Sequence, residues 1–175
     1  TCVMETAQVV ACCRSSTWKG ATLAMTENYL DAASVERHLE GRDPVGLLRD
    51  MVGFDTQSDE SPLIDYLANR WAALDIPFVV SPARDGRRNI TASVGERGPS
   101  LLYNSHMDTV PPGDRALWHD DAGPFDGIVR DGRLYGRGAV DAKGCLASMI
   151  SAYEALFLVG AGEHGSLTLS AVCWE

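Results

Sequence analysis

The chain has 175 residues, 45% of them hydrophobic and 22% charged, and a formal net charge of −9 at pH 7. A chain of this length buries roughly 70% of its unfolded surface, which is enough for one hydrophobic core. The acidic balance argues against a nucleic-acid surface, which needs clustered Lys and Arg. No apolar run reaches the roughly 20 residues of a membrane span. We therefore expect a globular protein with no nucleic-acid partner and no membrane partner.

The N-terminal 24 residues differ from the rest of the chain. They begin with Thr rather than Met and show no sustained hydrophobic period, whereas a helix-like pattern opens at Met25. We interpret Met25 as the natural start. Residues 1–24 are then expected to be a non-native or disordered N-terminal extension, and residues 25–175 to be the folded part.

The cysteines predict the redox compartment. Five are present, with no CxxC pair and with three crowded near the start, at Cys2, Cys12, Cys13, Cys145 and Cys173. A disulfide framework is not expected from this pattern. A secretory signal would show a charged start, then an apolar stretch and a small-residue cleavage site, and this pattern is not seen in the sequence. We expect a reducing, cytoplasmic location.

From residue 43 onward, helix and strand signals alternate. Asp43-Pro44 and Ser61-Pro62 each supply an N-cap followed by proline at the first helical position. A long apolar-periodic helix is predicted over 142–159, ended by Gly160 and Gly162. Strands are predicted at 76–80, 90–94, 100–104 and 167–173. The alternation indicates an α/β fold, with a mixed, largely parallel sheet covered by helices on both faces.

A histidine and an aspartate follow the strand predicted at 100–104. In an extended backbone, residues two apart point to the same side, so His106 and Asp108 project together. Open α/β sheets bind ligands at this end of their strands. A metal-binding histidine normally donates its other N–H to a carboxylate or carbonyl, and Asp108 is placed to accept it. The alternative for an isolated His-x-Asp pair is a loop histidine beside a solvated aspartate.

A glycine-rich segment, 134–144, enters the long helix. Glycines before a helix can cradle phosphate, but a P-loop requires Gly-Lys-Ser/Thr and here Lys143 precedes Gly144. The second interpretation makes Asp141 a metal ligand at the helix start, with glycines permitting close backbone approach. The third is a capping aspartate. Glu175 adds one more carboxylate at the tip of the last strand, where a terminal glutamate is usually only solvated.

The order of these motifs is similar to one known family. The two blocks 105–114 and 131–144, joined by Trp118 and Pro124-Phe125, resemble the zinc-dependent amidohydrolases and peptidases. That family includes acetylornithine deacetylase, succinyl-diaminopimelate desuccinylase, aminoacylase and glutamate carboxypeptidase. The resemblance extends from about Asp43 to the last residue. It implies that residues 25–175 form the N-terminal part of a catalytic domain of the zinc-exopeptidase kind.

The resemblance also implies a role for each matching residue. His106 would bind one of two zinc ions, with cobalt or manganese as alternative metals, and Asp141 would bridge both ions. Asp108 would orient His106. Glu175 would be the general base, although Trp174 stands where the family commonly has an acidic residue.

The activity implied by the resemblance is hydrolysis of an amide bond in an N-acylated amino acid or small peptide. The resemblance is also compatible with a homodimeric full-length enzyme. Further metal ligands of the family would lie beyond residue 175. Two alternatives follow: a non-catalytic fragment with an incomplete metal site, or a relative that kept the fold only for binding. We expect the 175 residues alone to be inactive.

Overall fold

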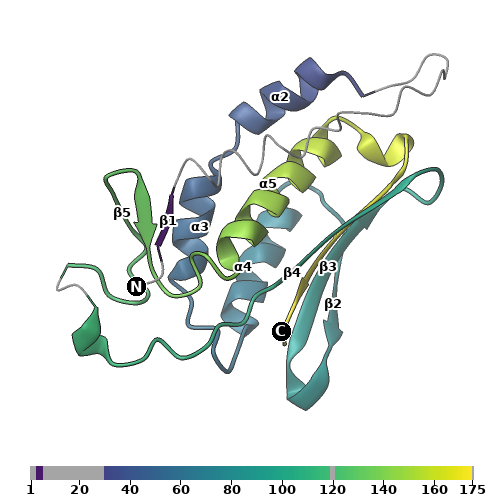
Figure 1. Ribbon diagram of the computed structural model, residues 1–175. Helices are drawn as coiled ribbons and strands as arrows, with labels where there is room; N and C mark the ends of the chain where they lie inside the picture. Colours follow the sequence, from purple (N-terminus) through teal and green to yellow (C-terminus); the bar gives the residue numbers. More distant parts are fainter. Residues whose placement is uncertain (1–2, 6–29, 119–120, 175) are drawn as a thin grey trace.

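The computed structural model describes residues 3–5, 30–118 and 121–174 (Figure 1). Three α-helices come first in the main part, at α2 (Ala32–Glu40), α3 (Pro44–Val52) and α4 (Ser61–Ala72). A fourth helix, α5 (Lys143–Leu158), is the longest. Strands occur at β1 (Val3–Glu5), β2 (Phe78–Pro82), β3 (Arg88–Val94), β4 (Ser100–His106), β5 (Ile128–Arg130), β6 (Arg133–Tyr135) and β7 (Ser166–Val172). Short 3-10 helices lie at η1 (Arg84–Gly86), η2 (Arg115–Leu117) and η3 (Ala161–Glu163).

The starts of the early helices follow their capping residues. The Asp43 carboxylate accepts the Gly46 N–H at 2.8 Å, and Pro44 opens α3, as the sequence predicts. At α4 the cap differs from the prediction. The Asp59 carboxylate, rather than the Ser61 hydroxyl, accepts a backbone N–H at the helix start, at 2.9 Å from Ser61 N. Ser61 is already the first helical residue.

The main sheet has four strands in the order β2-β3-β7-β4. The pairs β2–β3 and β3–β7 are antiparallel, and only β4–β7 is parallel. Register places Leu167, Leu169 and Ala171 of β7 on one face, where they are buried, and Thr168 and Ser170 on the other. Each strand of this kind buries one face and leaves the other polar.

The helices pack on the apolar face of the sheet. Figure 1 shows α3, α4 and α5 on one side of it, α5 contacts β4 and β7, and α4 contacts β2 and β3. Helix α5 is buried along most of its length and forms the centre of the core. Trp71 of α4 and Tyr153 of α5 are both fully buried, with ring centroids 6.5 Å apart.

The predicted α/β class and mixed sheet are confirmed, with two corrections within the described residues. The sheet is not largely parallel, because a β2–β3 hairpin contributes two antiparallel pairings. Helices do not cover both faces either: Leu102 and Val79, on the second face, are 60% and 66% exposed. Hydroxyl pairs such as Thr91–Ser170, at 3.1 Å, make this second face polar. Alternation of strands and helices along the sequence could not reveal the hairpin's strand direction.

A small second sheet, ordered β1-β6-β5, stands apart from the main one (Figure 1). Strand β1 pairs antiparallel with β6, so Val3–Glu5 of the predicted N-terminal extension form regular structure. Residues 1–2 and 6–24 of that extension lie outside the described residues, and Met25 as the natural start stays a prediction. In the part of the chain that the structure describes, no helix is long and apolar enough to cross a membrane.

Candidate metal centre

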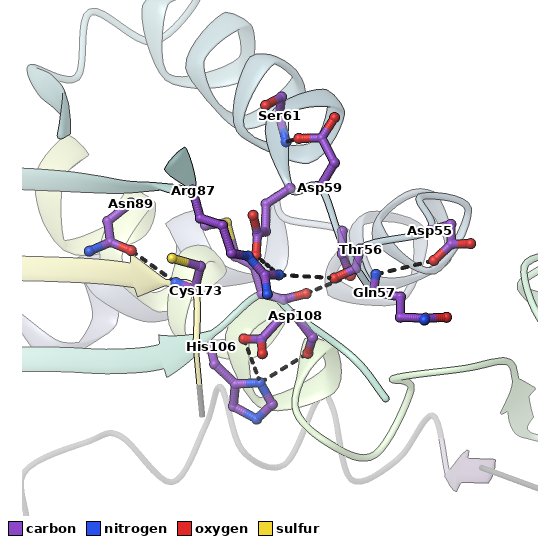
Figure 2. Close-up of polar contacts among 12 residues, drawn as sticks. Asp55, Thr56, Gln57, Asp59, Ser61, Arg87, Asn89, His106, Asp108 and Cys173 are labelled. Atoms are coloured by element: carbon purple, nitrogen blue, oxygen red, sulfur yellow. Dashed lines mark hydrogen bonds and ion pairs between the residues drawn. The ribbon is translucent and has the colours of Figure 1, made fainter. Parts of the chain in front are cut away.

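The first candidate ligand ends an edge strand. His106 is the last residue of β4, opposite Val172 of β7, and its side chain is only 15% exposed. Its Nδ1 lies 3.0 Å from the Asp108 carbonyl oxygen and 3.5 Å from the Asp108 carboxylate (Figure 2). The backbone carbonyl is therefore the nearer partner, and the carboxylate that the sequence analysis favoured is the more distant one. Donation from Nδ1 leaves Nε2 as the ring nitrogen that faces outward.

The second candidate ligand precedes the long helix. Asp141 comes just before α5, its carboxylate is 70% exposed, and its peptide bond to Ala142 is cis. Asp141 Oδ1 lies 3.1 Å from His106 Nε2. The fold thus brings the two motif blocks together at this point.

The His106–Asp141 contact fits a shared cation. A neutral ring whose Nδ1 donates presents a lone pair at Nε2, and a lone pair facing a carboxylate oxygen at 3.1 Å needs a proton or a cation between them. Tetrahedral zinc, with bonds of about 2.0–2.1 Å to each ligand, holds neighbouring ligand atoms about 3.3 Å apart. Imidazole nitrogen and carboxylate oxygen are both zinc ligands. The two residues therefore fit a metal ion.

This pair alone does not complete a site. Among the residues described, no group of three or more His, Cys, Asp and Glu side chains could hold a metal ion. Structural zinc takes four protein ligands, and catalytic zinc usually three. Asp108 Oδ1 and Thr109 Oγ1, in the same motif, are buried and have no hydrogen-bond partner within the described part of the chain. Glu175 lies outside the described residues.

Electrostatics favour positive charge at the ring. Burial lowers the pKa of His106, but this is outweighed by the hydrogen bonds to the Asp141 carboxylate and the Asp108 carbonyl and by the charges of both carboxylates. The pKa of His106 therefore stands above its ordinary value. The same arrangement would attract a metal cation.

The glycines of the second block serve close packing between the two motifs. Gly138 has a φ of +80°, and a Cβ there would lie 2.6 Å from Thr109 Cγ2. A side chain at this position would push the two motif loops apart. This agrees with the interpretation in which glycine permits close backbone approach.

The nearby lysine does not form a phosphate cradle. Lys143 is fully buried, and its Nζ donates to the Phe54 carbonyl at 2.7 Å. Burial lowers the pKa of Lys143 to about 8, against a smaller opposite effect from the Asp55 charge. Because its buried ammonium is hydrogen-bonded to the loop after α3, Lys143 cannot act as a substrate-facing cation. The Arg137 guanidinium lies 6.0 Å from the Trp118 ring centroid.

No sequence motif indicates the polar residues that lie behind the site. Thr56 is fully buried and its hydroxyl donates to the Met107 carbonyl at 2.7 Å. The Thr56 carbonyl accepts the Thr109 N–H at 3.4 Å. Arg87 donates to the same carbonyl at 3.4 Å. These polar residues lie in short loops with no motif, and only the tertiary structure brings them beside Asp108 (Figure 2).

The comparisons with known proteins agree with this fold. Residues 102–175 match Peptidase family M20/M25/M40. The chain is 43% identical over 98 residues to a succinyl-diaminopimelate desuccinylase from Methylobacterium nodulans, covering 54% of this chain and 24% of that protein. It is 34% identical over 133 residues to a succinyl-diaminopimelate desuccinylase from Rhodospirillum centenum, covering 73% of this chain and 34% of that protein. The chain thus spans about a quarter to a third of the length of these relatives.

Two solved structures share the fold. One is an M20 family metallo-carboxypeptidase from Sulfolobus solfataricus, with a TM-score of 0.60 and 20% identity, covering 74% of this chain and 30% of that one. The other is a di-peptidase from Saccharomyces cerevisiae, with a TM-score of 0.58 and 20% identity, covering 81% of this chain and 34% of that one. Residues 102–175 carry part of the domain of Peptidase family M20/M25/M40. The predicted resemblance is confirmed, and the family implies a metal cofactor.

Proposed function

We propose that the complete protein is a zinc-dependent hydrolase that cleaves the amide bond of N-acylated amino acids or small peptides. The observation that carries this proposal is the 3.1 Å approach of His106 Nε2 to Asp141 Oδ1. The other ring nitrogen of His106 already has the Asp108 carbonyl as its partner. Relatives named succinyl-diaminopimelate desuccinylase support the substrate class.

Each proposed residue has a distinct task. His106 and Asp141 would hold the metal, which would be zinc, with cobalt and manganese as alternatives. When bound, the ions polarise the scissile carbonyl and lower the pKa of a water molecule. Asp108 fixes the direction of His106 through its backbone carbonyl. Glu175 takes the proton of the attacking water and gives it to the leaving amine.

A substrate panel tests this function. The complete protein, supplied with zinc, would be offered N-succinyl amino acids, N-acetyl amino acids and dipeptides. We expect hydrolysis of at least one class. Glu175→Ala should lose turnover and keep its zinc, whereas Glu163→Ala, at an exposed residue of η3, should keep both. Normal turnover in Glu175→Ala would remove that residue from the base role, and a wild-type protein that hydrolyses none of the panel would contradict the function.

For the 175 residues taken alone, we propose a non-catalytic state. The described residues supply His106 and Asp141 but no group of three ligands, and this observation favours weak metal affinity. Isothermal titration of the 175-residue chain with zinc should show no tight binding of two ions. Tight two-ion binding by this chain would contradict the proposal.

Three further features of the parent protein stay proposals. We assign residues 25–175 to the N-terminal part of its catalytic domain, with 1–24 as an extension. A reducing, cytoplasmic location rests on the cysteine pattern of the sequence, which contains no CxxC pair. A homodimer follows from the resemblance alone, and sedimentation of the complete protein would test it.

A further inference from the structure

Arg87 is a buried cation behind the candidate metal centre. It lies between η1 and β3, and its side chain is 12% exposed. Its guanidinium forms an ion pair with Glu60, whose side chain is 2% exposed. Removing two charges from water costs several kcal/mol per ion, and an apolar pair of similar volume is often as stable. Stability alone is therefore a weak explanation for this pair.

The Arg87 guanidinium also bonds to the segment that holds the first metal motif. It donates to the Thr56 carbonyl, and the Thr56 hydroxyl donates to the Met107 carbonyl at 2.7 Å. The same Thr56 carbonyl accepts the Thr109 N–H. Thr56 therefore holds the residues on either side of Asp108, and Arg87 fixes Thr56. Figure 2 shows Arg87, Thr56 and Asp108 gathered beside His106.

The same turn also contacts the end of β7. The Arg87 guanidinium carbon lies 5.3 Å from the centroid of the Trp174 ring, within the range of a cation–π contact. Trp174 has a φ of +70°, which a tryptophan rarely adopts. Asn89, two residues after Arg87, accepts the Cys173 N–H at 2.9 Å (Figure 2). The segment that leads to Glu175 is thus held by the β2–β3 hairpin.

We infer that Arg87 is a positioning residue of the metal centre. It joins the Thr56–Glu60 loop, the His106–Thr109 motif and the Cys173–Trp174 turn, three segments distant in sequence. This inference rests on the proposed function. Among the described residues, Arg87 forms no hydrogen bond or ion pair with either candidate metal ligand, and it acts through Thr56 and Trp174. The planar guanidinium can pair with Glu60, donate to the Thr56 carbonyl and lie over the Trp174 ring at once, a combination that suits its fork geometry better than an ammonium.

The test separates positioning from stability. In the complete protein, Arg87→Met combined with Glu60→Leu replaces both buried charges with apolar side chains of similar size, so the fold is expected to survive. We expect kcat and zinc affinity to fall by about 10- to 100-fold, with KM little changed. Arg84→Met is the matched control: Arg84 also lies over Trp174, at 5.8 Å, but it forms an ion pair with its exposed neighbour Asp85. The control should behave as the unmodified protein.

A second variant keeps the inference testable if the double variant does not fold. Arg87→Lys keeps the charge opposite Glu60 but loses the planar guanidinium. We expect kcat and zinc affinity to fall in this variant too, by a smaller factor than in the double variant. If either folded variant keeps the kcat and zinc affinity of the unmodified protein, Arg87 has no positioning role.

Hydrogen exchange distinguishes the failure of this inference from failure of the proposed function. The Thr109 and Cys173 amides should exchange faster in the double variant while amides in the centre of α5 do not change. That result supports positioning of the two segments even in a protein that hydrolyses none of the substrates. Unchanged exchange at both amides would overturn the inference.

Discussion

Glu154 is the buried charge whose removal has the clearest expected cost. It lies on α5 with its side chain fully buried, and it accepts two hydrogen bonds from Arg70, at 2.6 Å from Nε and 2.8 Å from a terminal nitrogen. A third bond, at 3.2 Å, comes from Arg42. The carboxylate therefore ties α4 and the segment before α3 to the central helix. Glu154→Leu removes the acceptor and leaves two guanidinium groups facing an apolar side chain.

The magnitude follows from the exposure of the two arginines. Breaking a buried ion pair costs about 3–5 kcal/mol when the remaining charge has no other partner. The Arg42 and Arg70 side chains are 19% and 27% exposed, so each retains some contact with water. We therefore expect a loss near the lower end, about 3 kcal/mol. For a domain of this size that corresponds to a fall in Tm of about 10 °C.

Urea unfolding followed by circular dichroism would measure the loss. Glu163→Leu is the matched control, because Glu163 is an exposed glutamate of η3 and its free energy of unfolding should change by no more than about 0.5 kcal/mol. Combining Glu154→Leu with Arg70→Leu should recover part of the loss, since one stranded charge is removed. If Glu154→Leu is as stable as the Glu163→Leu control, the ion cluster does not stabilise the fold as argued.

Three further predictions concern single side chains. Thr56→Val removes the hydroxyl bonded to the Met107 carbonyl and should lower the free energy of unfolding by about 1–3 kcal/mol, whereas Thr56→Ser should not; equal stability of the Val variant would argue against that bond. Burial raises the pKa of Tyr153 to about 12, and its hydroxyl has no hydrogen-bond partner among the described residues. The stability that the neutral phenol contributes is complete below pH 10 and is lost as the pH rises through 12, so unfolding of Tyr153→Phe should lack this alkaline decline; an identical decline would contradict it. Gly138→Ala should cost at least about 1 kcal/mol, because alanine at φ +80° is strained and its Cβ meets Thr109; zinc content should fall as well, and an unchanged protein would contradict the close approach.

Local patterns in the sequence predict the elements of this fold well. The N-cap at Asp43 and the apolar periodicity after Gly144 are local signals, because each involves only residues close together in the sequence. Helices α3 and α5 lie where these signals predict them. The strand direction in the β2–β3 hairpin depends on pairing across a turn through η1. The Asp85-Gly86 pair between the two strands is itself a hairpin signal, and the strands of a hairpin run antiparallel. The largely parallel sheet was expected from the alternation of strands with helices, which does not apply to this pair.

The candidate site also contains residues that the sequence predicts and residues that it does not. The pairing of His106 with Asp108 follows from a two-residue spacing, although the backbone carbonyl proves nearer than the carboxylate. The meeting of His106 and Asp141 was expected from the family resemblance, since their separation in sequence carries no geometry. The surrounding network of Thr56 and Arg87 depends on loops that meet only after folding, and no residue type or spacing indicates it.

The metal content of a His106 variant is the most direct test of the central claim. The complete protein would be purified with zinc and its bound metal counted by elemental analysis, together with His106→Ala and the control His38→Ala on α2, whose ring bonds to the Ser34 carbonyl. If His106 Nε2 and Asp141 share a cation, His106→Ala should carry less zinc than the unmodified protein while His38→Ala carries the same amount. Equal zinc stoichiometry in all three proteins would contradict a metal centre at this site.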